Sequence, residues 1–193
     1  MKKTMTVFGA VLIASLVMTS CGGNKFELTS FTPNKTYEFH EYSIMNEFYD
    51  YLEFPAFTSI KDSCAYLKKL IRRSEKPNTQ YWYIHSKKFE KVVGTIGLLN
   101  LDNQRLSVEM GYGISPHHWG QGFLTSAGKI IIKYVFNNLQ LHRLVARTSI
   151  ENVPSMRGLT KLGFKKEGIL RDYYRRQTGE WFDAVLMAQL DTD

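Results

Sequence analysis

The sequence contains little cysteine, no histidine arrangement suited to a metal, and no internal repeat. Two of its 193 residues are cysteines. Its five histidines include one adjacent pair, His117 and His118, whose side chains lack the spacing to bind one ion from a common face. No Ser–His–Asp combination suggests a covalent nucleophile. The sequence therefore predicts neither a metal centre nor a covalent enzyme intermediate.

The amino-acid composition is that of one globular domain. Hydrophobic residues make up 44% of the chain, aromatic residues 13% and charged residues 22%, which suffices for a core in a protein of this length. The 25 basic and 18 acidic residues give a formal charge of +7, which suits a polyanionic ligand. The basic residues are scattered and no nucleic-acid motif occurs, so nucleic acid is not an expected partner.

The first residues have the pattern of a leader peptide. Lys2 and Lys3 precede an apolar run from Val7 to Val17, which suits a signal-peptide core but is too short to span a bilayer. The small residues before Cys21 resemble a bacterial lipobox, which implies cleavage before Cys21 and acylation of that residue. The acyl chains would then hold the mature protein on a membrane.

We therefore divide the chain into three parts. Residues 1–21 are the predicted lipoprotein-like signal peptide, residues 22–25 a spacer, and residues 26–193 the folded domain. Two alternatives remain for the leader. It is an N-terminal helix, or it is a fused or misassigned start, in which case the protein stays in the cytoplasm.

The rest of the chain predicts an α+β domain with a mixed sheet. Alternating apolar residues predict strands, and apolar residues at helical spacing predict helices. The predicted strands are Lys25–Phe31, Gln80–Ser86, Lys91–Leu99, Arg105–Ser115, Arg143–Ile150, Gly168–Arg176 and Trp181–Leu190. The predicted helices cover Thr32–Leu52 as one helix or a pair, Ile60–Ser74, a stretch from Thr125 to near Asn138, and a short segment beginning at Pro154. Antiparallel strands followed by a crossover helix favour this class over a doubly wound sheet.

The stretch from Val108 to Phe136 is the one around which the domain is organised. A strand stops at Pro116, a glycine-bearing loop follows, and a helix begins. Gly120 and Gly122 allow the backbone to approach an anion, and the free N–H groups of the first helical turn would point at it. The loop is therefore a candidate pyrophosphate-binding site.

This loop, His117-His118-Trp119-Gly120-Gln121-Gly122, resembles the acyl-CoA signature of the GNAT acetyltransferase superfamily, a Gln or Arg followed by x-x-Gly-x-Gly or Ala. It is most similar to the branch of the ribosomal-protein alanine N-acetyltransferases, with His117 in the place of the Gln or Arg. The resemblance implies the GNAT fold, an α+β domain whose mixed, mostly antiparallel sheet has about seven strands, flanking helices and a splayed strand pair at the acyl-CoA site. It also implies acetyl-CoA as co-substrate, bound by Ile114, His117, Trp119, Gly120, Gln121, Gly122, Phe123, Leu124, Asn152 and Ser155.

A second motif supports the resemblance. Residues 151–164 match the family's Asn-x-x-Ser, then a helix, then Lys-x-Gly-Phe. The resemblance implies that Asn152 bonds the pantetheine arm and that Ser155 lies beside the sulfur as a proton donor to the thiolate. Both side chains are also residues that prefer helix-capping positions, and Pro154 and Gly163 suit the two ends of a short helix.

Acyl transfer to an amine requires a group that takes the amine proton, a donor for the oxyanion and a proton for the departing thiolate. Glu109 is the candidate base, because the family often has an acidic residue facing the acceptor in this strand. The alternative for Glu109 is an exposed strand carboxylate. Tyr173 is a fallback proton donor, so the predicted catalytic residues are Glu109, Ser155 and Tyr173.

The predicted activity is direct transfer of an acetyl group from acetyl-CoA to a primary amine on a peptide N-terminus or a small molecule. Four aromatic residues before the second helix would line the acceptor pocket or belong to the core: Tyr49, Tyr51, Phe54 and Phe57. The alternative is a membrane-anchored lipoprotein that uses the fold as a non-catalytic binding module, because acetyl-CoA is made in the cytoplasm and a cleaved lipobox places the domain outside. The sequence leaves the acceptor and the oligomeric state open.

Overall fold

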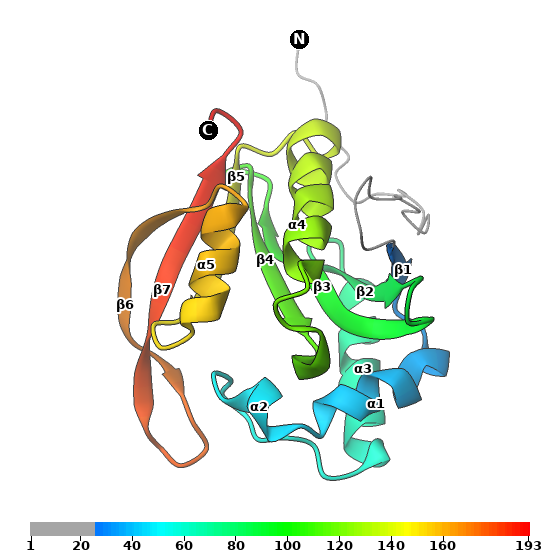
Figure 1. Ribbon diagram of the computed structural model, residues 1–193. Helices are drawn as coiled ribbons and strands as arrows, with labels where there is room; N and C mark the ends of the chain where they lie inside the picture. The colour runs from blue at the N-terminus through cyan, green and yellow to red at the C-terminus, as the bar shows by residue number, and fades with distance from the viewer. Residues whose placement is uncertain (1–25) are drawn as a thin grey trace.

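The computed structural model of the protein describes residues 26–193, so the predicted leader, Cys21 and the predicted spacer lie outside the described residues. One sheet of seven strands, in the order β1-β2-β3-β4-β5-β7-β6, forms its centre (Figure 1). The strands are β1 (Phe26–Ser30), β2 (Gln80–Ser86), β3 (Lys91–Asp102), β4 (Ser107–Ile114), β5 (Arg143–Ser149), β6 (Lys165–Arg175) and β7 (Trp181–Leu190). Neighbouring strands are antiparallel except β4 and β5, which are parallel. The predicted fold class is confirmed.

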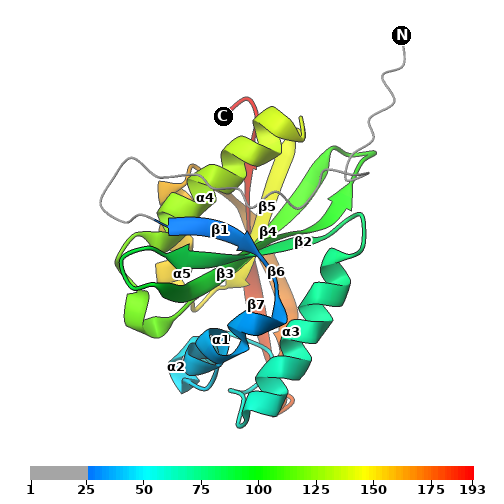
Figure 2. The same ribbon diagram turned by 90° about the vertical axis from the view of Figure 1, so that its right-hand side faces the viewer.

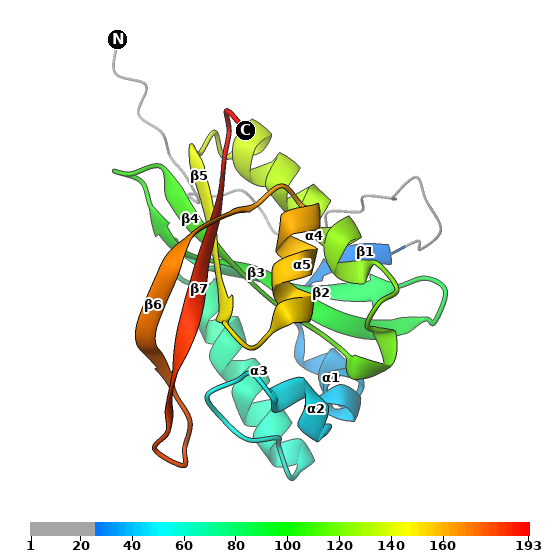
Figure 3. The same cartoon turned by 60° about the vertical axis from the view of Figure 1, so that its left-hand side comes forward.

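Helices cover both faces of the sheet. The view in Figure 2 places α3 and α4 on opposite sides of the sheet, and Figure 3 shows α5 beside α4. The helices are α1 (Thr36–Ser43), α2 (Asn46–Tyr49), α3 (Ile60–Ser74), α4 (Phe123–Lys133) and α5 (Val153–Lys161). A π-helical turn over Tyr134–Asn138 continues α4, so the central helix ends where the sequence predicts.

Each face of the sheet has its own apolar core. Trp82 and Tyr83 are neighbours on β2 and point to opposite faces, as the period of a strand requires. Trp82 joins the larger core together with Ile131 of α4, whereas Tyr83 joins the smaller core together with Leu67 of α3. All four residues are at most 1% exposed. The sheet is therefore buried on both sides, and the site must lie at an edge or an opening of it.

Helix ends follow local sequence chemistry. Ser59 and Asp62 form a reciprocal capping box at the start of α3, in which each side chain accepts from the other's backbone N–H. At α5, Asn152 caps the first turn. Gly163 follows the last turn with a φ of 96°, a left-handed conformation that favours glycine. These residues fix where α5 begins, and α5 carries part of the site.

The parallel pair β4 and β5 is joined over a short length. Ser107–Glu109 pair with Arg143–Val145. Beyond that point β4 continues along β3 to Ile114, while β5 continues along β7 to Ser149. The two strands therefore separate, and the predicted splayed pair is confirmed.

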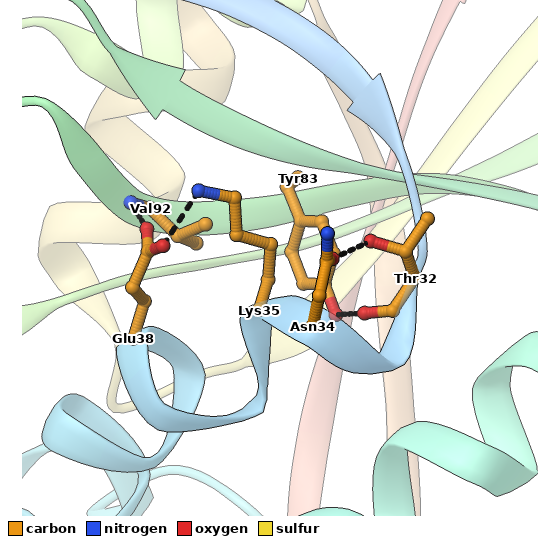
Figure 4. A network of polar contacts seen from close by, with 6 residues as sticks. All are labelled: Thr32, Asn34, Lys35, Glu38, Tyr83 and Val92. Carbon is orange, nitrogen blue, oxygen red and sulfur yellow. Dashed lines mark hydrogen bonds and ion pairs between the residues drawn. The ribbon is translucent and has the colours of Figure 1, made fainter.

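A carboxylate ties α1 to β3 (Figure 4). The backbone N–H of Val92 donates to Glu38 at 2.6 Å, and Lys35 donates to the same carboxylate at 2.6 Å. The Tyr83 hydroxyl donates to the carbonyl oxygen of Thr32 at 3.1 Å. The β2–β3 register shifts beside Val92, so Glu38 supplies an acceptor where the ladder is irregular.

Replacing Glu38 by alanine is expected to lower the free energy of unfolding by about 1–3 kcal/mol, because the N–H of the buried Val92 then loses its acceptor. Urea denaturation measures this loss. Glu41→Ala is the matched control, since Glu41 makes an exposed pair with Lys91 and no other ion pair within residues 26–193, and it should change stability by no more than about 0.5 kcal/mol. Equal losses in the two variants would contradict the anchoring role of Glu38.

Candidate active site

Two glycines shape the loop between β4 and α4. Gly120 has a φ of 72° and Gly122 a φ of 80°. Gly122 is also the N-cap of α4, where no side chain caps the helix and the first turn has no acidic residue. A Cβ built on either glycine would meet no atom of the described residues within 4 Å, apart from those of its neighbours in the chain. The loop therefore presents a helix N-terminus to open space, which is the arrangement that binds anions.

Hydrogen bonds brace this loop. Trp119 Nε1 donates to the carbonyl oxygen of Ile114 at 2.7 Å, which connects the loop to the end of β4. Gln121 Nε2 donates to the carbonyl oxygen of His117 at 3.0 Å. The side chains of His117 and Gln121 are exposed. Their contact closes the loop upon itself.

His118 belongs to the same loop, but its side chain is buried, with 7% of the residue exposed. Its ring centroid is 4.6 Å from that of Phe89 and 5.8 Å from that of Phe123. Burial lowers the pKa of His118, with further lowering by nearby Lys91 and His117. The imidazole is therefore neutral near pH 7 and packs as an aromatic residue.

A cavity of about 270 Å³ opens between the loop, β4 and the start of α5. Most of the residues predicted to bind acetyl-CoA line it: Ile114, Trp119, Gly120, Gly122, Phe123, Leu124, Asn152 and Ser155. His117 and Gln121 do not line it. The structure thus brings together two motifs that lie about thirty positions apart in the sequence.

The segment around α2 forms the opposite wall of this cavity. Phe48 packs directly against β4 at Gly113, where a Cβ would lie 2.7 Å from the ring of Phe48. Glycine at this position is therefore what allows the close approach. Tyr51 and Leu52, just after α2, complete the wall.

The backbone of β4 faces the opening left by β5. The N–H of Ser115 donates to the carbonyl oxygen of Val93 on β3 at 2.9 Å. Because hydrogen-bonding direction alternates along an antiparallel strand, the N–H groups of Tyr112 and Ile114 point away from β3. Within the part of the chain that the structure describes, no strand pairs with β4 on that side beyond Glu109. These donors are available to a ligand that enters the opening.

The start of α5 places two polar side chains in the same cavity. Asn152 Oδ1 accepts from the N–H of Ser155 at 3.0 Å, so Asn152 caps the helix and lines the cavity at once. The Ser155 Oγ lies 2.7 Å from the hydroxyl oxygen of Tyr112 on β4. Burial raises the pKa of Tyr112 to about 12. A protonated phenol therefore stands beside Ser155 across the neutral pH range.

A second cavity of about 150 Å³ adjoins the first. Their linings share Tyr51, Leu52, Tyr112, Asn152 and Ser155. The smaller cavity alone is lined by Glu53, Phe54, Arg147 and Tyr174, among others. Of the four aromatic residues predicted for the acceptor pocket, Tyr51 and Phe54 line this smaller cavity. Tyr49 and Phe57 instead pack against each other, with ring centroids 5.7 Å apart.

Glu109 lies beside the smaller cavity without lining it. Its two carboxylate oxygens accept from Nε and Nη2 of Arg147, the first at 3.0 Å. Asn100 also donates to it, at 2.9 Å. The carboxylate is neither an exposed strand residue nor set in an apolar wall. It is held by a guanidinium that itself lines the cavity.

Tyr173 contacts Arg147 but does not itself line the smaller cavity. Its hydroxyl accepts from Nη1 of Arg147, and the side chain is 39% exposed. Neither cavity is lined by Tyr173. The neighbouring Tyr174 lines the smaller cavity, and burial raises its pKa. Of these two neighbouring tyrosines, it is therefore Tyr174 that lines the smaller cavity.

Two side chains of the site escape sequence reasoning, those of Tyr112 and Arg147. The pattern of β4 predicts that Tyr112 shares a face with Met110, but not that its hydroxyl reaches another element. Arg147 alternates with buried residues of β5 like any strand arginine. No local signal marks either as a site residue.

Between residues 26 and 193, no group of three or more His, Cys, Asp or Glu side chains is arranged to hold a metal ion. No helix in the same range is long and apolar enough to cross a membrane.

Comparison with known proteins identifies the family. The acetyltransferase (GNAT) domain profile matches residues 25–165. The uncharacterized N-acetyltransferase p20 of Bacillus licheniformis is 31% identical over 140 residues, covering 72% of this chain and 78% of the relative. The ribosomal protein uS5-alanine N-acetyltransferase of Escherichia coli K12 is 34% identical over 84 residues, covering 44% of this chain and 43% of that enzyme.

Solved structures agree on the fold. The microcin C7 self-immunity acetyltransferase MccE, in complex with acetyl-CoA and AMP, superposes with a TM-score of 0.77 at 20% identity, covering 86% of this chain and 92% of MccE. The chain therefore belongs to the GNAT acetyltransferase family, and some of its relatives are ribosomal-protein alanine acetyltransferases. It is an acetyl-CoA-dependent N-acetyltransferase that acts on an amine, as the sequence predicts.

Proposed function

We propose that acetyl-CoA occupies the larger cavity, that a primary amine enters through the smaller one, and that the acetyl group passes between them at Ser155. The amine belongs to a peptide N-terminus or a small molecule. The observation that carries this proposal is that the two cavities adjoin and share lining residues, among them Tyr112, Asn152 and Ser155. Two substrates, one bound in each cavity, would therefore meet beside these residues.

Acetyl-CoA would be held along its length by different groups. Its pyrophosphate would bind the N–H groups at Gly120–Gly122 and the first turn of α4. Its pantetheine arm would run along the open side of β4, where the N–H of Ile114 would donate to the thioester carbonyl oxygen. The space beside Gly120 and Gly122, where a Cβ would meet no atom of the described residues, leaves room for the pyrophosphate.

The proposed step is a direct displacement. The amine nitrogen forms a bond to the acetyl carbon, the C–S bond breaks, and sulfur keeps the electron pair. The amine loses one proton, and the thiolate gains one, so the step is balanced. Ser155 would supply the proton to sulfur, and Glu109 would take the amine proton, with Arg147 fixing the direction of the carboxylate. Solvent would then return a proton to Ser155 and remove the one held by Glu109, which restores both groups.

Glu109→Gln is expected to lower turnover at least tenfold, because glutamine cannot accept a proton. Steady-state kinetics with saturating acetyl-CoA and amine measure the loss. Glu167→Gln is a matched control, since Glu167 is likewise paired with an arginine of β5, Arg143, and lines neither cavity. If Glu109→Gln turned over as fast as Glu167→Gln, the base role would move to water or Tyr173.

Calorimetric titration of acetyl-CoA into the domain from Asn24 to Asp193, followed by a screen of amine acceptors, tests the proposed function. Micromolar binding and acetylation of peptide N-termini or small amines are the expected results. A folded sample that binds no acetyl-CoA would favour the alternative, a non-catalytic binding module. The relatedness to an alanine N-acetyltransferase makes alanine-initiated peptides the first acceptors to test.

For location, we propose that the leader anchors the protein to a membrane through Cys21. The support is the sequence alone, in which a basic start, an apolar run and small residues precede Cys21. Fractionation of cells expressing the full chain, compared with Cys21→Ser, tests it. Equal amounts of both forms in the soluble fraction would favour the cytoplasmic alternative.

A further inference from the structure

The hydroxyl of Tyr112 lies where the two cavities meet. Tyr112 stands on β4 beyond Glu109, the last residue that pairs with β5. Its hydroxyl oxygen is 2.7 Å from Oγ of Ser155 on α5, and its ring packs against the larger core. This hydrogen bond therefore connects β4 to α5, the helix that follows β5, beyond the point where β4 and β5 diverge.

Either hydroxyl could donate in this pair, and the surroundings decide between them. Among the described residues, the Tyr112 hydroxyl has no hydrogen-bond partner other than Ser155. If Tyr112 accepted from Ser155, its own proton would lack an acceptor in a largely buried site. If Tyr112 donates, its proton is satisfied and that of Ser155 remains free. A phenol is also a stronger donor than an aliphatic alcohol, because it is the stronger acid.

We infer that Tyr112 is a positioning residue, which donates to Ser155 Oγ and thereby directs the Ser155 hydroxyl proton into the junction of the two cavities. The inference rests on the proposed function, in which that proton meets the departing thiolate. Asn152 already fixes the backbone N–H of Ser155. Tyr112 removes the remaining freedom, which is rotation of the side chain and of its hydroxyl.

This role predicts a particular division between binding and turnover. The Ser155 proton serves the thiolate only as the C–S bond breaks, so its alignment stabilises the transition state and not bound acetyl-CoA. Loss of the Tyr112 hydroxyl should therefore lower kcat and leave KM for acetyl-CoA nearly unchanged. A residue that only filled space in the cavity wall would disturb both.

The test compares Tyr112→Phe, Ser155→Ala, the double variant and Tyr134→Phe, with kcat and KM for acetyl-CoA measured for each. Tyr134 is the matched control, because it is a buried tyrosine of the same core that lines neither cavity. Tyr112→Phe is expected to lower kcat about tenfold with KM within about twofold, and Ser155→Ala to lower kcat at least as far. The double variant should be no slower than Ser155→Ala alone, because Tyr112 acts through Ser155.

Each outcome decides the matter. Multiplied losses in the double variant, or a Tyr112→Phe enzyme with the kcat of Tyr134→Phe, would overturn the inference and leave the proposed function standing. Thermal melting of Tyr112→Phe beside Tyr134→Phe separates a folding defect from a loss of alignment. A folded wild-type protein that neither binds acetyl-CoA nor acetylates any amine would overturn the proposed function, and the inference with it.

Discussion

Replacing Gly120 by glutamate is expected to weaken acetyl-CoA binding at least 100-fold, or about 2.7 kcal/mol, in calorimetric titration. Gly120 has a φ of 72°, and a Cβ built on it would meet no atom of the described residues within 4 Å. A glutamate side chain therefore has room, although the positive φ strains its backbone, and it enters the space assigned to the pyrophosphate. Its negative charge also opposes the helix N-terminus that would bind the phosphates.

Gly179→Glu provides the matched control for this experiment. Gly179 has a φ of 92° and lies in the turn between β6 and β7, away from both cavities. The control thus introduces the same charge and a similar backbone strain without touching the loop. Unchanged affinity is expected. If Gly120→Glu kept micromolar affinity, or if both variants lost binding equally, the loop would not be the phosphate site.

Phe123→Ala is expected to lower the free energy of unfolding by about 3–5 kcal/mol, a large part of the 5–15 kcal/mol that is usual for a domain. The resemblance predicts Phe123 as a cofactor contact, and the residue does line the larger cavity. Its side chain is nevertheless only 1% exposed and packs against the rings of His118 and Phe89 at the first position of α4. Urea denaturation measures the loss.

Leu124→Ala is the comparison for Phe123→Ala. Leu124 is the next residue of α4, lines the same cavity and is only half-buried. Its truncation should cost less than half as much stability. Unchanged stability of Phe123→Ala together with weaker acetyl-CoA binding would show that the ring serves the ligand and not the fold.

Sequence reasoning worked best where the apolar pattern is regular and the ends are marked. β2, β7 and α3 have the predicted bounds, because alternation or helical spacing continues up to a turn or a cap. β6 begins three positions before the prediction, since Lys165, Lys166 and Glu167 form an exposed strand edge without apolar alternation. β4 begins two positions late, because Asp102 accepts from the N–H of Arg105 at 2.9 Å and holds it in a turn.

The site was predictable only in its local parts. The glycines of the loop and the Asn152–Ser155 cap are visible as short motifs whose residues act on neighbouring backbone. The contact of Tyr112 with Ser155 joins residues 43 positions apart, and that of Glu109 with Arg147 joins residues 38 positions apart. Such pairings depend on how the strands diverge, which no short pattern in the sequence encodes.

The short join between β4 and β5 has a thermodynamic consequence. Three residue pairs connect these strands, whereas seven connect β3 with β4 and seven connect β5 with β7. The sheet is thus two plates, β1–β4 and β5–β7, with a narrow seam between them. A ligand lodged in the opening would contact both plates and so oppose their separation, adding about 2.7 kcal/mol to the free energy of unfolding at a concentration of 100 times Kd. Occupancy of the active site and cohesion of the sheet are therefore linked through that seam.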